Sequence, residues 1–73
     1  MLEHPNVLST RPAVRWDHGR QVIIYVIETD LAVSPEDPGY DEKALDSIAE
    51  AALARLPGCR NRACIRFERV ALA

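Results

Sequence analysis

Aromatic residues and long apolar runs are both scarce in this sequence. It has one tryptophan, two tyrosines and one phenylalanine in 73 residues, and its longest unbroken apolar run covers only residues 22–27. A helix that crosses a bilayer needs about 20 mostly apolar residues, so no membrane span is predicted. The N-terminal residues lack the basic start and apolar stretch of a secretory signal, and a cytoplasmic location is therefore expected.

Cysteine and histidine are also rare, with two residues of each. Cys59 and Cys64 are spaced more widely than the cysteines of the usual zinc motifs, which also need four nitrogen or sulfur ligands. A disulfide between them is sterically possible but is not expected in a reducing cytoplasm. We therefore expect two reduced thiols, with Cys64 as a packing residue and Cys59 in a loop, and we predict no metal or other cofactor.

No catalytic motif is recognisable. Asp17 and His18 are neighbours, but no serine or cysteine stands beside them in the sequence. Their position between two strand-like segments is typical of turn residues. We therefore predict that the protein is not an enzyme. A small metal or thiol protein that uses Cys59, Cys64 and His18 is the alternative with the least support.

Charges of opposite sign are segregated along the chain, although the net charge is only −2. Residues 28–50 hold eight acids and one base, a balance of −7, whereas residues 51–73 hold five arginines and one glutamate, a balance of +4. Such segregation bears on partners rather than on fold. The acidic total argues against direct nucleic-acid binding, because dedicated binders are usually basic overall.

Residues 12–28 are typical of a β-hairpin. Two strand-like segments flank His18 and Gly19, and a type I′ turn requires positive φ at both of its central positions, which glycine adopts freely and histidine tolerates. The turn sets Asp17 opposite Arg20. Because side chains alternate along a strand, each strand has two faces. One face is expected to carry Val14, Trp16, Ile23, Tyr25 and Ile27, and the other Ala13, Arg15, Val22, Ile24 and Val26.

Residues 41–58 predict an amphipathic helix, and residues 61–72 a final strand. Asp41 suits the helix N-cap, and Pro57 with Gly58 ends the helix. The connection before it contains Pro38 and Gly39, which suit the centre of a type II turn. Apolar residues recur at helical spacing. They are Leu45, Ile48, Ala49, Ala52, Leu53 and Leu56 on the helix, with Ile65 and Phe67 of the last strand facing it.

This order of elements predicts an α+β fold, β-β-α-β, with one helix packed on a small three-stranded sheet. The third strand should run parallel to the second. Order 1-2-3 places the apolar second strand in the centre and is slightly favoured, whereas order 2-1-3 makes every neighbouring pair antiparallel. Residues 12–73 are expected to form the single domain, and residues 1–11 a loosely ordered arm.

One helix covers one face of a sheet, so the outer face is predicted to leave apolar side chains in water. An apolar centre with a charged rim is typical of a protein interface, and we predict self-association there, with a dimer favoured. In the alternative, Val7 and Leu8 of the arm cover this face. The predicted self-association surface consists of Ala13, Arg15, Val22, Ile24, Val26 and Arg66.

Glu42, Asp46 and Glu50 follow i, i+4, i+8 spacing and form an acidic stripe opposite the apolar face of the helix. Like charges at this spacing repel, and only Lys43 and Arg55 stand near enough to compensate. The stripe is either an ordinary solvated face or a binding surface for a basic partner. The predicted partner-binding surface consists of Glu36, Asp37, Asp41, Glu42, Asp46 and Glu50.

Two resemblances bear on function. In size and in its acidic residues 28–50, the chain resembles small phage inhibitors of host defence, such as anti-CRISPR proteins. This resemblance implies a non-enzymatic module that presents carboxylates to a basic or nucleic-acid-binding partner. Residues 38–58 followed by 64–72 are similar to the helix-then-strand end of phage tail-completion proteins, which implies, as the alternative, a structural assembly subunit.

Overall fold

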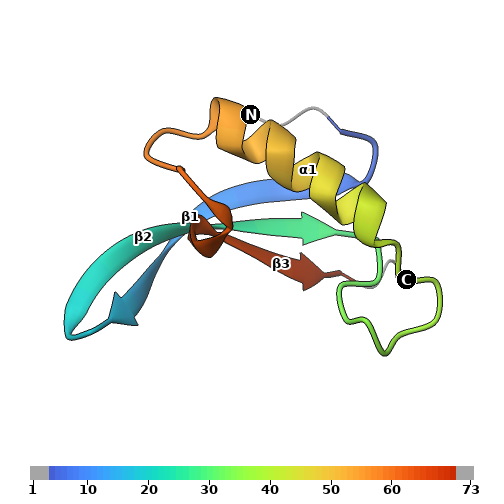
Figure 1. The fold of residues 1–73 in the computed structure, drawn as a ribbon, viewed down its shortest axis with the longest axis horizontal. Coiled ribbons are helices and arrows are strands. Elements are labelled where there is room, and N and C mark those ends of the chain that lie inside the picture. The colour runs from blue at the N-terminus through green and yellow to red at the C-terminus, as the bar shows by residue number, and fades with distance from the viewer. Residues whose placement is uncertain (1–3, 71–73) are drawn as a thin grey trace.

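Two strands, a helix and a third strand follow one another in the computed structural model, which describes residues 4–70. They are β1 (Val7–Asp17), β2 (Arg20–Thr29), α1 (Glu42–Arg55), the short 3-10 helix η1 (Arg62–Cys64) and β3 (Ile65–Arg69). The sheet order is β1-β2-β3, with β1 antiparallel and β3 parallel to β2. The predicted α+β fold and the favoured sheet order are confirmed (Figure 1).

The hairpin turn and the loop turn both have the predicted geometry. His18 and Gly19 have φ values of 50° and 77°, and Asp17 is paired with Arg20. Positive φ at both central residues is what a type I′ turn requires. Gly39 has φ 81°, and the backbone N–H of Tyr40 donates to the carbonyl of Asp37 at 3.3 Å, as expected of a type II turn.

β1 begins earlier than the sequence predicts. Residues 7–11 pair with β2 instead of forming an arm, and the register shifts between Val7 and Ser9, which indicates a bulge at Leu8. Val7 packs against the core beneath the helix, so it does not cover the outer face as the alternative supposed. Residues 1–3 of the expected arm lie outside the described residues.

The core lies between α1 and one end of the sheet. The Asp41 side chain accepts a hydrogen bond from the backbone N–H of Ala44 at 3.2 Å and caps the helix, as predicted. Ile27, Ile48 and Ala52 are fully buried. The partly buried side chains that pack against them are Val7, Leu31, Ala51, Leu56, Ile65 and Phe67.

The hairpin is longer than the elements that cover it. The 14 residues of α1 span roughly 21 Å at about 1.5 Å each, whereas the 11 residues of β1 span roughly 36 Å at about 3.3 Å each. β3 has only five residues and pairs with Tyr25–Thr29, because residues 62–64 form η1 instead of the predicted strand. The turn end of the hairpin therefore projects beyond α1 and β3 (Figure 1).

Candidate functional sites

Five of the six residues of the predicted self-association surface line one cavity on the outer face of the sheet, and two of these five are buried. A shallow cavity of about 330 Å³ on this face is lined by Ala13, Arg15, Ile24, Val26 and Arg66 of that surface, with Arg11 and Glu68 beside them, whereas Val22, its sixth member, lines a different pocket. Ile24 is only 6% exposed and Val26 only 3%. The premise that their apolar side chains are left in water is therefore wrong, and self-association through this face stays a prediction without that support.

Charged residues of the two edge strands flank Val26 in register. Val26 is paired with Arg11 of β1 on one side and with Arg66 of β3 on the other. The Arg11 guanidinium donates to Glu68 at 3.1 Å and lies 3.8 Å from a carboxylate oxygen of Glu28. Long side chains shield apolar surface with their methylene stems while their charged ends stay in water.

The exposed apolar surface lies instead on the helix-side face of the projecting hairpin. Val14, Trp16 and Ile23 are 61%, 67% and 66% exposed. Val14 is paired directly with Ile23, and Trp16 is paired with Gln21. We call Val14, Trp16 and Ile23 the hairpin patch. The sequence predicted the face on which they lie but also predicted that α1 would cover it, which is wrong because α1 is shorter than the hairpin.

The predicted acidic surface divides into residues used by the fold and residues that face solvent. Asp41 caps α1, and Asp46 accepts a hydrogen bond from Arg62 at 2.6 Å. The prediction that only Lys43 and Arg55 stand near the stripe missed Arg62, which is 16 positions away in sequence. The other four members of this surface form no salt bridge among the described residues. Asp37 is half-buried, and the other three are exposed. The four are Glu36, Asp37, Glu42 and Glu50.

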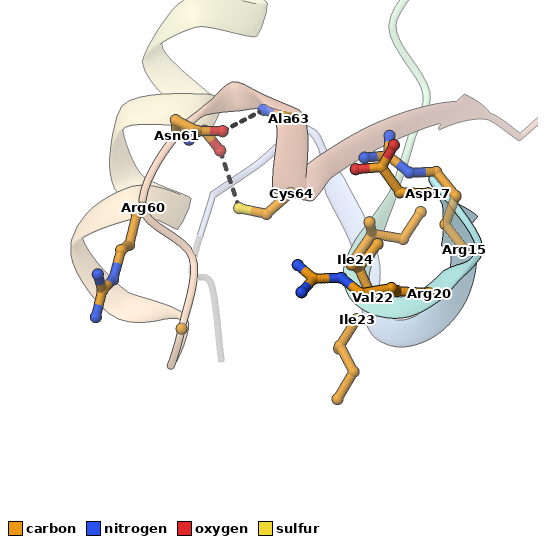
Figure 2. Close-up of a pocket in the computed structure, with 11 residues that line it drawn as sticks. Arg15, Asp17, Arg20, Val22, Ile23, Ile24, Arg60, Asn61, Ala63 and Cys64 are labelled. Carbon is orange, nitrogen blue, oxygen red and sulfur yellow. Dashed lines mark hydrogen bonds between the residues drawn. The ribbon is translucent and has the colours of Figure 1, made fainter.

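A pocket of about 520 Å³ lies between the projecting end of β2 and the segment that follows α1. Its walls carry Arg15 and Arg20 from the hairpin and Arg60 from the facing segment, with Asp17 as the one acid among its lining residues. Figure 2 shows the Arg20 side chain reaching from β2 toward the segment that carries Asn61 and Cys64. We call this the arginine pocket. Residues 62–64 leave the strand direction here because the Asn61 side chain accepts from the N–H of Ala63 at 2.9 Å and starts η1.

The two cysteines form a disulfide, which corrects the prediction of two reduced thiols. Cys59 and Cys64 are bonded, with their Cα atoms 5.6 Å apart. Cys59 is buried, whereas Cys64 is half-buried and lines the arginine pocket, the reverse of the burial expected. Within residues 4–70, no three histidine, cysteine or acidic side chains are placed to hold a metal ion together.

Asp17 and His18 lie at the hairpin tip, as predicted. The nearest oxygen of Asp17 is 3.6 Å from Nε2 of His18, and the His18 side chain is 95% exposed. A catalytic histidine is usually oriented by a hydrogen bond and placed beside a nucleophile. No serine, threonine or cysteine is among the residues paired with this tip, so the arrangement fits a turn.

Residues 4–70 contain no helix with the length and apolar character that a bilayer crossing requires. No protein-family model, curated protein or solved structure matches this chain.

Proposed function

We propose that this chain is a small, non-enzymatic protein-interaction module that dimerises through its hairpin patch. The observation that carries the proposal is the joint exposure of Val14, Trp16 and Ile23 on one face of a strand pair. Clustered apolar side chains on a small domain are typical of an interaction surface. Tryptophan is also among the residues that contribute most to protein–protein binding.

A second copy of the chain is the favoured occupant of the patch. The residue paired with Trp16 is the uncharged Gln21, and the strand neighbours Arg15 and Val22 point to the opposite face of the sheet. A two-fold contact places the same surface of both copies together. The hairpin patch contains no charge that would repel its own copy, so a two-fold dimer is electrostatically permitted.

Trp16 is the only tryptophan in the chain and therefore reports on this contact directly. Sedimentation velocity and tryptophan emission should be followed together from about 1 µM to about 1 mM protein. We expect a shift from monomer to dimer and a matching shift of the emission to shorter wavelength. Ile23→Ser should abolish both while keeping the reporter. Leu8→Ser, which alters an exposed leucine outside the patch, should change neither. A monomer with unchanged emission across this range would contradict the proposal.

A second proposed role assigns the exposed acids to a basic partner, such as the nucleic-acid-binding surface of another protein. It is supported by the exposure of Glu36, Glu42 and Glu50 without a salt bridge among the described residues. The loop that precedes α1 lies at the end of the molecule opposite the hairpin turn, so both surfaces can be occupied at once (Figure 1). If these carboxylates occupied the positions where the partner binds nucleic-acid phosphates, the chain would block that site and act as an inhibitor.

This role is tested by capture of a nucleic-acid-binding protein on the immobilised chain. Glu42→Lys with Glu50→Lys should abolish the capture, competing DNA should displace the captured protein, and Ile23→Ser should leave it bound. Capture that survives the two charge reversals would contradict this role. A phage assembly subunit remains the other proposal from sequence, and it predicts rings or filaments in place of a closed dimer.

A cytoplasmic location also remains a proposal. Disulfides persist in oxidising compartments and are rare in the cytosol. Alkylation of cells before lysis, followed by mass spectrometry of residues 59–64, should therefore find both thiols modified if the chain is cytoplasmic. Unmodified, bonded cysteines would place it elsewhere.

A further inference from the structure

The projecting end of β2 has an unpaired backbone edge. β3 pairs only with Tyr25–Thr29, so Arg20–Ile24 has no strand beside it on that side within the described residues. In an antiparallel pair, alternate residues turn their backbone N–H and C=O away from the partner strand. Thr29 is one of the residues of β2 that turn their backbone groups away from β1. Its carbonyl accepts a hydrogen bond from the N–H of Val70 at 2.8 Å, on the β3 side. Counting back in twos, Gln21 and Ile23 turn their backbone groups toward the same side.

This unpaired edge forms one wall of the arginine pocket. Arg20, Val22, Ile23 and Ile24 line one side, and the segment from Gly58 to Cys64 lines the other. The pocket therefore occupies the place that β3 would have taken if η1 had continued as a strand. The unpaired edge offers the backbone N–H and C=O groups of Gln21 and Ile23 at the two-residue spacing of an extended chain. Ile23 lines the pocket itself, and Gln21 lies between the lining residues Arg20 and Val22.

The pocket also selects for charge. Arg15, Arg20 and Arg60 give three positive charges, and Asp17 gives one negative charge, a local balance of +2 in a chain whose total is −2. All four side chains are exposed, so their charges are available to a ligand. A backbone edge with arginines beside it is suited to an extended peptide with acidic side chains.

We propose that the arginine pocket binds an acidic peptide segment in extended conformation, which adds to β2 as a strand along Gln21–Ile23. A nucleic acid is a poorer match, because its phosphates only accept hydrogen bonds and would meet the carbonyls of Gln21 and Ile23. The other long edge of the sheet is less suited, because Pro12, paired with Tyr25 in the middle of β1, lacks an N–H.

The proposal shares Ile23 with the proposed dimer, but it uses the backbone of Ile23 and the arginines, whereas the dimer uses the Ile23 side chain. The test is a titration of the ¹⁵N-labelled full chain with the capped peptide Glu-Val-Glu-Val-Glu-Val, followed by NMR. We expect the amide signals of Gln21 and Ile23 to shift and their hydrogen exchange to slow. The same peptide with alternate backbone nitrogens methylated should not bind, because it cannot complete the ladder.

Charge selection is tested with matched variants. Arg20→Glu and Arg60→Glu should each weaken binding by about tenfold. Arg69→Glu makes the same charge change beside Thr29, at the other end of the sheet, and should leave the affinity unchanged. The folded spectrum of each variant confirms that a loss of affinity is not a loss of structure. Replacing the peptide glutamates with lysine should also abolish binding.

Four outcomes would overturn the proposal. They are equal binding of the acidic and lysine peptides, equal binding of the methylated peptide, the same amide shifts with the oligonucleotide dT8, and the same shifts without peptide on raising the concentration of the Ile23→Ser variant, which keeps the backbone edge but lacks an intact hairpin patch. The result with dT8 would assign the pocket to single-stranded nucleic acid, and the result on raising the protein concentration would assign it to a second copy of the chain.

Discussion

Arg11 on β1 and Glu68 on β3 are joined by an ion pair, with Nη2 and Oε2 3.1 Å apart, across the strand that separates them. Val26 lies in that central strand, between Arg11 and Arg66 in register, and is 3% exposed. This is how the described part of the chain, with α1 on one face of the sheet, accommodates a strand that is apolar on both faces. Charged side chains on the edge strands shelter one face, and α1 shelters part of the other.

Arg11→Ala should lower the free energy of unfolding by about 1 kcal/mol, because it removes both the ion pair and the stem that covers Val26. Glu68→Gln should cost less, since it keeps the stem and loses only a half-exposed charge. Urea unfolding measures both, and Arg69→Ala, an exposed arginine on the same strand, is the control. If Glu68→Gln lowers the free energy of unfolding more than Arg11→Ala does, the charge of the ion pair, and not the shielding of Val26 by the Arg11 stem, is the larger contribution.

The Cys59–Cys64 disulfide closes a short loop, with a sequence separation of five. The chain-entropy estimate for such a loop is about 2 kcal/mol, a large share of the stability of a small domain. Replacing both cysteines with serine should therefore lower the urea midpoint, and a reducing agent should lower the wild-type midpoint to a similar value. The double variant should not respond to the reductant. A wild-type midpoint that reduction leaves unchanged would contradict the prediction.

Asp46 and Arg62 pair across 16 positions, with both side chains about half exposed, and the Arg62 guanidinium also lies 5.9 Å from the ring centre of Phe67. A double-mutant cycle with Asp46→Asn and Arg62→Gln should give a coupling of about 0.5 kcal/mol. The coupling should decrease at about 0.5 M NaCl, because salt screens exposed charges. Glu50→Gln combined with Arg62→Gln is the matched control and should give no coupling.

Local rules predicted the local features of this fold. Positive φ at His18 and Gly19, the Asp41 cap and the buried stripe around Ile48 each depend on a few neighbouring residues, and each is confirmed. The features that the sequence did not predict depend on distant residues. The Arg11–Glu68 pair spans 57 positions, and Arg62 reaches back to Asp46.

The hairpin patch was missed because it depends on a difference in length between elements. The alternation of Val14 and Trp16 placed them on the helix-side face, but nothing in that pattern says how far α1 extends along the hairpin. The hairpin was predicted to start at Pro12, whereas Pro12 lies within β1, at an edge where no N–H is needed. β1 therefore starts at Val7, and α1 lies over that end of the sheet.

Tyr25 connects β2 to the segment that ends α1, because its hydroxyl donates to the carbonyl of Pro57 at 2.9 Å. Tyr25→Phe removes the donor and leaves the ring in place, so it should lower the free energy of unfolding by about 1 kcal/mol with an unchanged urea m-value. Tyr40→Phe is the matched control, because the hydroxyl of this half-buried tyrosine makes no hydrogen bond among the described residues. Since Pro57 directly precedes the wall of the arginine pocket that begins at Gly58, Tyr25→Phe should also speed hydrogen exchange at Cys59. If Tyr25→Phe and Tyr40→Phe lower the free energy of unfolding equally, the Tyr25 hydroxyl does not hold the segment that follows α1 in place.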